Sequence, residues 1–199
     1  MGERDKLIEG AKRCLQERGY AHSTARDIAR ASGANLASIG YHFGSKDALL
    51  LEAMLEATME WAEKLQHALT DDARVAEPPQ DRFESLWRRV IEMLDLYRPV
   101  FVANIEVFAQ AERQPRLRRE LADAQESARL EWAGWLGPQA HPVPEETRRA
   151  VGSFYLTMLT GLVMQRLIDP ERAPTSEELS RALRAIAVCD DEPVPPARG

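Results

Sequence analysis

The stretch ARDIARASGANLASIGYHFGSKDALL, residues 25–50, decides the fold of this 199-residue chain. It reads as a short helix that ends at a Ser-Gly pair, a second short helix over about 35–43, and the start of a longer helix. In the second helix, Leu36, Ile39 and Phe43 recur at the spacing of one helical face, which predicts that they point inward. The opposite face carries small and polar side chains, so it is left free for a partner outside the fold.

The helical pattern continues on both sides of this stretch, and the alternation typical of β-strands does not occur. Pro and Gly fall between the helical segments, and several segments have Pro in their first turn. We expect an N-terminal domain of three short helices over 1–50, a helical domain over 51–189, and a disordered tail over 190–199. The sequence therefore predicts an all-α fold of about nine helices, over residues 3–18, 24–32, 35–43, 46–69, 81–97, 99–112, 115–136, 144–168 and 176–189.

Composition excludes several classes of protein. With 44% hydrophobic and 29% charged residues, the chain has enough apolar material for a core, which is not typical of disorder. Its first ten residues are charged and no run of about 18 apolar residues occurs, so we expect neither a signal peptide nor a membrane span. Cys14 and Cys189 are far apart and form no metal or redox motif. We therefore expect free thiols and a cytoplasmic protein.

Charge and histidine spacing indicate which chemistry to expect. Residues 1–50 carry eight Lys or Arg and six Asp or Glu, a net charge of +2 in a chain whose total is −6. A basic head on an acidic body suits contact with a polyanion. His22, His42, His67 and His141 lack the spacing of zinc ligands, and no nucleophile elbow, phosphate-binding loop or dinucleotide motif occurs. We expect a protein that is not an enzyme and has neither a metal site nor a cofactor.

A tight helix-turn-helix junction of this kind places its second helix in the major groove of DNA. On the outward face of that helix, Asn35 and Ser38 can hydrogen-bond base edges or phosphates, and Ala37 can touch a thymine methyl group. Arg26 can read a guanine or contact a phosphate, while Lys46 adds a cation to the positive end of the next helix. Tyr41 and His42, near the end of the second helix, are expected to contact the DNA backbone. The residues expected at the DNA are Thr24, Arg26, Asn35, Ala37, Ser38, Tyr41, His42 and Lys46.

This region resembles the N-terminal domain of the TetR family of bacterial transcriptional regulators. The matching pieces are the T-x-R-D-I-A motif from Thr24, the Ala-Ser-Gly turn, the Tyr-His-Phe cluster and the Gly-Ser-Lys-Asp sequence from Gly44. The resemblance covers about residues 5–52 and implies a homodimer that binds a palindromic operator and represses transcription until a small-molecule effector binds. Gly40 departs from the family pattern, which often has a larger, DNA-contacting residue at this position.

The resemblance also implies that the domain over 51–189 binds the effector and forms the dimer. Its aromatic side chains and the nearly all-apolar segment VFVANIEVF, residues 100–108, support a buried pocket for an apolar or aromatic ligand. Glu106 interrupts that segment, and it pairs with an arginine or a cationic ligand, or it faces solvent at a helix edge. The expected ligand-binding residues are Trp61, Trp87, Tyr97, Phe101, Asn104, Phe108, Trp132, Met158 and Gln165.

The predicted helix over 144–168 is apolar on two faces, so one face needs a partner beyond the chain's own core. With the last helix it can form a four-helix bundle across a two-fold axis. The helix over 46–69 starts at the DNA and borders the expected pocket, so we expect it to transmit effector binding. Two alternatives stay open: an all-helical interaction protein with degenerate DNA binding, and a helical enzyme. The expected dimer-interface residues are Leu156, Leu159, Val163, Leu167, Leu179, Leu183 and Ile186.

Overall fold

The structure is a computed structural model that describes residues 2–70, 79–136 and 143–189. Over these residues the chain forms nine α-helices and no strand, which confirms the predicted all-α fold. The expected tail over 190–199 lies outside the described residues. The helices are α1 (Glu3–Arg18), α2 (Ala25–Ser32), α3 (Leu36–Phe43), α4 (Lys46–Thr70), α5 (Pro79–Leu96), α6 (Arg98–Ala111), α7 (Pro115–Leu136), α8 (Glu145–Ile168) and α9 (Ser176–Cys189).

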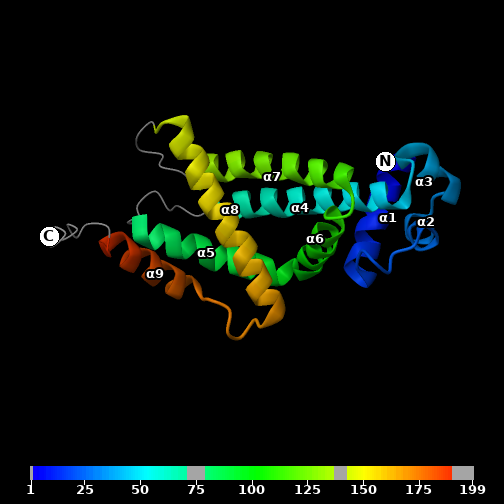
Figure 1. Ribbon diagram of the computed structural model, residues 1–199. Helices are drawn as coiled ribbons and strands as arrows, with labels where there is room; N and C mark the ends of the chain where they lie inside the picture. Colours follow the sequence, from blue (N-terminus) through cyan, green and yellow to red (C-terminus); the bar gives the residue numbers. More distant parts are fainter. Residues whose placement is uncertain (1, 71–78, 137–142, 190–199) are drawn as a thin grey trace.

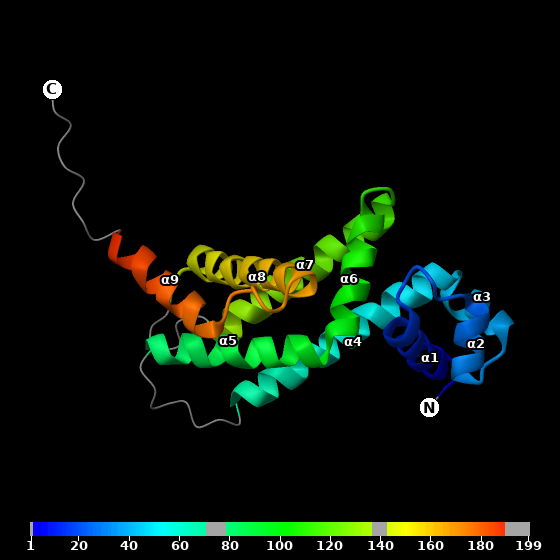
Figure 2. The same ribbon diagram turned by 90° about the horizontal axis from the view of Figure 1, so that it is seen from below.

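The helices α1, α2 and α3 form a head at one end of an elongated molecule (Figure 1). α4 begins in the head and runs into the body, so one continuous helix joins the two parts (Figures 1 and 2). Its 25 residues span about 37 Å at 1.5 Å per residue. α6 contacts α1 and α4 as well as α5, α7 and α8, so it also bridges the head and the body.

Local capping fixes where the helices of the head begin and end. The Thr24 hydroxyl accepts a hydrogen bond from the Asp27 backbone N–H at 3.2 Å, and the Asp27 carboxylate accepts one from the Thr24 N–H at 3.1 Å. This reciprocal pair is the capping box that starts α2. Gly33 ends α2 in the left-handed conformation, with φ of 68°. Asn35 then caps α3 by accepting from the Ala37 N–H at 2.9 Å.

Two apolar clusters build the interior. The first joins the head to the body, because it takes residues from α1 to α4 and from α6 and α7; Leu7, Met54 and Val107 are fully buried in it. The second fills the body between α4 and α8, and its largest members are the buried indoles of Trp61 and Trp87. The first cluster therefore attaches the head to the body through α4 and α6.

The first turn of α3 is more exposed than its residue pattern predicted. Ile39 is buried and Phe43 is half-buried, as expected, but 45% of Leu36 is exposed. The predicted inward position of Leu36 is wrong, because the described chain does not cover the first turn of this helix, where Ala37 is also exposed. Cys14 of α1 is a buried free thiol, and burial raises its pKa, so it stays protonated and unreactive at neutral pH.

A buried cation strengthens the packing of α1 on α4. The Lys12 side chain is only 6% exposed, and its ammonium lies 2.7 Å from Glu56, 2.6 Å from Glu60 and 3.1 Å from Glu9. Burial opposes the charged form of Lys12, but hydrogen bonds to the three carboxylates outweigh it and raise the pKa of the lysine above its ordinary value. A raised pKa means that this contribution to stability is lost only at strongly alkaline pH, so the cluster holds at neutral pH.

α8 is long and apolar enough to cross a membrane by length and composition, although polar residues such as Thr157, Thr160 and Gln165 interrupt its apolar sequence. Only 22% of its apolar window is buried in the chain. A core helix of a protein without any membrane satisfies the same criterion. α8 therefore leaves Phe154, Met164 and Ile168 exposed.

We expect Gly152→Ala to destabilise the chain, because a Cβ at Gly152 would lie 2.0 Å from the carbonyl oxygen of Arg129, where α8 crosses α7. Forcing the two helices apart should lower the free energy of unfolding by about 1–3 kcal/mol in a urea titration. Gly40→Ala is the control, because nothing lies within 4 Å of its added Cβ. That variant should gain up to about 1 kcal/mol from helix propensity. Equal stability of the two variants would contradict the close crossing.

Candidate nucleic-acid interface

The outward face of α3 is open and small. Tyr41 is 86% exposed, and its ring meets the His42 ring edge-on at a centroid distance of 4.9 Å. Ala37 and Gly40 are exposed on the same helix, and no atom lies within 4 Å of the place where a Cβ on Gly40 would be. Around Gly40 and Tyr41 this face is open, so a groove of duplex DNA can approach this part of the helix backbone closely.

Several residues expected at the DNA also hold the head together. The Asn35 side-chain oxygen caps α3 and the Thr24 hydroxyl caps α2, so both have structural roles. The Ser38 hydroxyl donates to the Glu3 carboxylate at 2.8 Å, which brings α1 to the start of α3. Arg26, by contrast, is exposed on α2 and has no ion-pair partner within the described residues.

Lys46 lies at the start of α4, where the helix dipole adds to its charge. Its ammonium is 3.0 Å from the Asp47 carboxylate and 5.7 Å from the centre of the Tyr20 ring, and the side chain is 31% exposed. Burial raises the pKa of Tyr20 to about 12, so the ring stays neutral beside the lysine at physiological pH. Lys46 thus has one competing carboxylate and an accessible ammonium, which suits contact with a phosphate.

Glu106 of α6 forms a direct polar link between the head and the body. Its carboxylate accepts hydrogen bonds from the backbone N–H of Tyr20 at 2.6 Å and of Ala21 at 3.1 Å, in the loop between α1 and α2. The same loop contains Gly19, whose φ is 77° and whose added Cβ would lie 3.1 Å from the carboxylate. Glu106 therefore binds backbone amides, an arrangement that was not among the three predicted ones.

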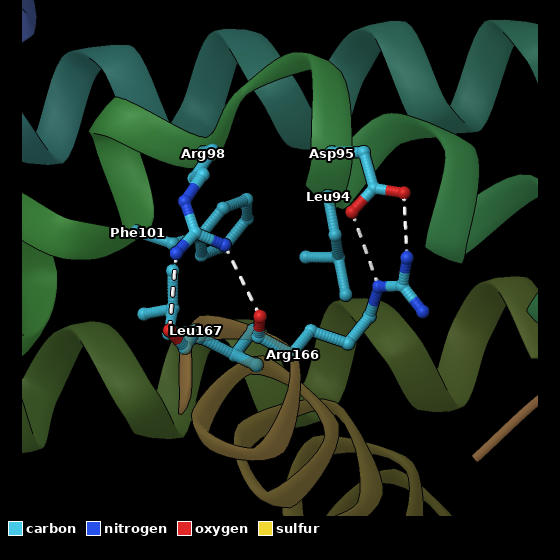
Figure 3. Close-up of a pocket in the computed structure, with 7 residues that line it drawn as sticks. Leu94, Asp95, Arg98, Phe101, Arg166 and Leu167 are labelled. Atoms are coloured by element: carbon cyan, nitrogen blue, oxygen red, sulfur yellow. Dashed lines mark hydrogen bonds and ion pairs between the residues drawn. The ribbon is translucent and has the colours of Figure 1, made fainter. Parts of the chain in front are cut away.

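The other end of α6 is fixed to the last turn of α8 (Figure 3). The Arg98 guanidinium donates to the carbonyl oxygens of Arg166 at 3.1 Å and Leu167 at 3.0 Å, which caps the C-terminus of α8. Arg166 in turn pairs with Asp95 through two hydrogen bonds, of 3.1 and 2.6 Å. The cavity between these side chains and Phe101 has a volume of about 10 Å³, roughly the space of one water molecule. The arginines here serve mainly to join α5 and α6 to α8.

Four of the predicted ligand-binding residues lie buried together in the body. The Trp61 ring is 5.0 Å from Phe101 and 6.4 Å from Trp132, measured between ring centres. Tyr155, which the prediction omitted, stacks on Trp87 at 6.4 Å and lies 6.5 Å from Trp132, so it joins the indoles into one cluster. The sequence pattern placed Tyr155 only on one of the two apolar faces of this helix, and no local signal identified its position among the rings.

Two features of this aromatic cluster bear on ligand binding. The indole nitrogens of Trp61 and Trp87 are buried and have no hydrogen-bond acceptor within the described residues. A buried N–H without an acceptor is costly and rare in proteins, so the cluster holds two donors that a ligand could satisfy. The rings pack against one another, so a ligand must part them to reach these donors.

The other predicted ligand-binding residues are more scattered. Tyr97 and Met158 pack at the edge of the aromatic cluster, whereas Phe108 packs against the first apolar cluster beside the head. Asn104 donates to the Thr58 hydroxyl at 3.1 Å and to the Val100 carbonyl at 2.9 Å, which joins α6 to α4. Gln165 is exposed on α8.

Comparison with known proteins identifies the family. Residues 7–53 match the tetR family of bacterial regulatory proteins, and residues 78–188 match the tetracyclin repressor-like C-terminal domain. The chain belongs to the TetR family. The members of this family are regulatory proteins, so the prediction that the chain is not an enzyme is confirmed.

Individual relatives agree with this assignment. The HTH-type transcriptional regulator BetI of Rhizobium meliloti is 31% identical over 186 residues, which cover 90% of this chain and 84% of the relative. The HTH-type transcriptional repressor AcnR of Corynebacterium efficiens is 28% identical, and the match spans 63% of this chain and 59% of AcnR. The multidrug binding protein EbrR, in its crystal structure with imidazole, is 25% identical with a TM-score of 0.67, covering 100% of this chain and 99% of EbrR.

The structure of this TetR-family chain exposes a different face of α8 from the predicted one. Leu159 and Val163 are 7% exposed and belong to the chain's own core. Phe154 is 45% exposed and Ile168 is 78% exposed on the other side of the helix, and Ile186 of α9 is 65% exposed. The remaining predicted interface residues are half-buried: Leu156, Leu167, Leu179 and Leu183.

We expect Glu106→Ala to loosen the joint between head and body. The variant lacks the carboxylate that accepts from Tyr20 and Ala21, so these two backbone N–H groups lose their hydrogen bonds. This loss should lower the free energy of unfolding by about 1–3 kcal/mol. Native-state hydrogen exchange should show faster exchange at the amides of Tyr20 and Ala21. Glu112→Ala, at the exposed end of the same helix, is the control and should leave both amides unchanged. Equal exchange rates in the two variants would show that Glu106 does not hold the loop.

Proposed function

We propose that the chain is a DNA-binding transcriptional repressor that binds a palindromic operator as a homodimer and releases it when an aromatic effector binds. The observation that carries the proposal is the open outer face of α3, where 86% of Tyr41 is exposed beside Ala37 and Gly40. The Tyr41 ring and its hydroxyl are therefore accessible to a partner outside the chain. In a helix-turn-helix head, that partner is the major groove and its phosphate backbone.

The predicted contacts take the following roles in this proposal. Ala37 and Gly40 let the α3 backbone approach the base pairs, and Ser38 reaches a base edge or phosphate. Tyr41 and His42 contact the DNA backbone at the far end of α3, and Lys46 contacts a phosphate. Asn35, Thr24 and Arg26 flank this surface; the first two can contribute while they cap their helices, and Arg26 extends toward a guanine or a phosphate. The head carries net positive charge and the body net negative charge, so the field of the chain turns the head toward DNA.

A second copy of the chain accounts for the exposed side of the body. Phe154, Met164 and Ile168 follow one another along one face of α8, and Ile186 extends the apolar surface onto α9. Two copies of this surface paired about a two-fold axis form a four-helix bundle and bury it from water. Such a dimer carries two heads, as a palindromic operator with two half-sites requires.

Regulation follows from helices that reach both the head and the aromatic cluster. α4 has Lys46 at the DNA end and Trp61 among the buried rings, and α6 has Glu106 on the head and Phe101 against Trp61. An effector that parts the rings displaces these helices and with them the heads, so it favours a form of the dimer that does not fit the operator. The effector class proposed is planar and aromatic, as is proflavin, with which EbrR has been crystallised.

The DNA-binding proposal is tested first by sequencing genomic fragments that the purified protein retains, and then by titrating the recovered site. We expect two chains per duplex and an affinity that falls steeply with salt. Lys46→Gln should weaken operator and unrelated DNA by the same factor and reduce the slope against the logarithm of salt by about 1 for each head. Lys64→Gln, on the body part of α4, is the control and should change neither. Absence of any retained DNA would favour the alternative of a helical interaction protein.

The effector proposal is tested with proflavin as the probe. Saturating proflavin should quench the emission of the buried tryptophans and weaken operator binding by about 5- to 150-fold, the usual range of allosteric coupling. Trp87→Phe, which removes one of the unpaired N–H donors, should require more proflavin to release the operator. Quenching without operator release would exclude coupling, and unchanged proflavin sensitivity in Trp87→Phe would exclude this cluster as the site.

A further inference from the structure

Glu3 places a negative charge on the surface that is proposed to face DNA. It is the first residue of α1 and is exposed to solvent. Its carboxylate oxygen Oε1 accepts a hydrogen bond from the Ser38 hydroxyl at 2.8 Å and lies 3.5 Å from the backbone nitrogen of Asn35. The hydrogen bond from Ser38, and then that from Asn35, hold the pKa of Glu3 below its ordinary value, so the side chain is an anion at neutral pH.

The chemistry of this contact is that of a phosphate contact. A hydroxyl and a backbone N–H at the start of a helix are the donors that protein–DNA complexes use for phosphate oxygens. A carboxylate offers the same charge and the same kind of acceptor as a phosphate oxygen. The donors of Ser38 and Asn35 can serve either Glu3 or DNA at one time, and a duplex that approaches α3 brings its phosphates toward an existing negative charge.

We infer that Glu3 is an internal competitor of the DNA phosphate, which must leave Ser38 and Asn35 before the recognition helix engages its site. This inference rests on the proposed DNA-binding function and adds a residue that lowers the affinity for DNA. Because Glu3 stands at the exposed start of α1, its side chain can turn toward water without disturbing the packed side of that helix. The cost of displacing it is the same for any duplex, so Glu3 lowers the affinity for operator and for unrelated DNA alike.

The opposite role for Glu3 is also physically clear, and it predicts the opposite result. If the carboxylate orients the Ser38 hydroxyl toward a base, then removing its charge loosens Ser38 and weakens operator binding more than binding to unrelated DNA. A plain charge effect, in which any acid near the DNA repels it, is the other possibility. The test therefore needs a neighbouring acid without a contact to α3, and Asp5 supplies it, because its carboxylate accepts from the Gly2 N–H at 2.8 Å.

The experiment titrates the recovered operator and an unrelated duplex with the wild type and with Glu3→Gln, Asp5→Asn, Ser38→Ala and the double variant Glu3→Gln/Ser38→Ala, each checked for folding by thermal denaturation. We expect Glu3→Gln to bind both duplexes about 2- to 10-fold more tightly for each head. Asp5→Asn should stay within about two-fold of the wild type. The gain from Glu3→Gln should shrink in the Ser38→Ala background, because the contested donor is then absent.

Three results would overturn the inference while leaving DNA binding intact. These are weaker or unchanged binding by Glu3→Gln, an equal gain in Asp5→Asn, and a gain from Glu3→Gln that does not depend on Ser38. A wild type that binds neither duplex refutes the proposed function itself, and this inference with it. The affinity of the wild type therefore separates the two failures.

Discussion

The apolar core shared by α1, α4, α6 and α7 fixes the head on the body, and both DNA binding and its regulation depend on that attachment. A head on a flexible tether would have no defined position relative to a second copy, so a dimer could not match two half-sites at a set spacing. Leu7, Met54 and Val107 bring the three main helices together without any exposed area, and the buried ammonium of Lys12 adds ion pairs between α1 and α4. Close packing of this kind transmits displacement, since a packed interface moves as a unit.

Two helices run from this core to the rest of the body, and they differ in how they are anchored. α4 is continuous from Lys46 in the head to Trp61 in the aromatic cluster. α6 is fixed by polar contacts at both ends: Arg98 holds the last carbonyls of α8, and Glu106 holds the loop before α2. In the proposed mechanism, a change at the exposed face of α8 reaches the head through α6, while a change among the rings reaches it through both α4 and α6. The proposed dimer contact and the proposed effector thus act on the head through the same helices.

The sequence predicted the helices well because the signals that begin and end them are local. Thr24 with Asp27 starts α2, Gly33 ends it, and Asn35 starts α3, each through contacts within four residues. Contacts between distant segments were not predicted. Glu106 pairs with amides 85 and 86 residues away, and nothing near it in sequence marks a backbone partner.

Periodicity does not rank the faces of a helix that is apolar on two sides. On α8 it could not decide which face turns inward, and Leu159 and Val163, which were predicted at the dimer interface, are buried in the chain's own core. Tyr155 was missed among the aromatic residues for the same reason, since its place depends on α5 and α7 meeting α8. The open surface of α3 was predicted because the small and polar residues of this helix all lie on one face. Leu36 was misplaced because the residue pattern does not show where the helices that cover α3 end.

The closed state of the aromatic cluster determines how an effector could act. Trp61, Phe101 and Trp132 lie in contact, so a ligand that stacks among them must bind a form in which the rings have separated. The closed form keeps its ring contacts and leaves two indole N–H groups without acceptors, whereas an open, ligand-filled form gives up ring contacts and satisfies the donors. A ligand that satisfies them therefore binds only one of the two forms, which is the condition for shifting a population. Effector binding is then coupled to operator binding if the closed form keeps α4 and α6 in positions at which the two heads fit the operator.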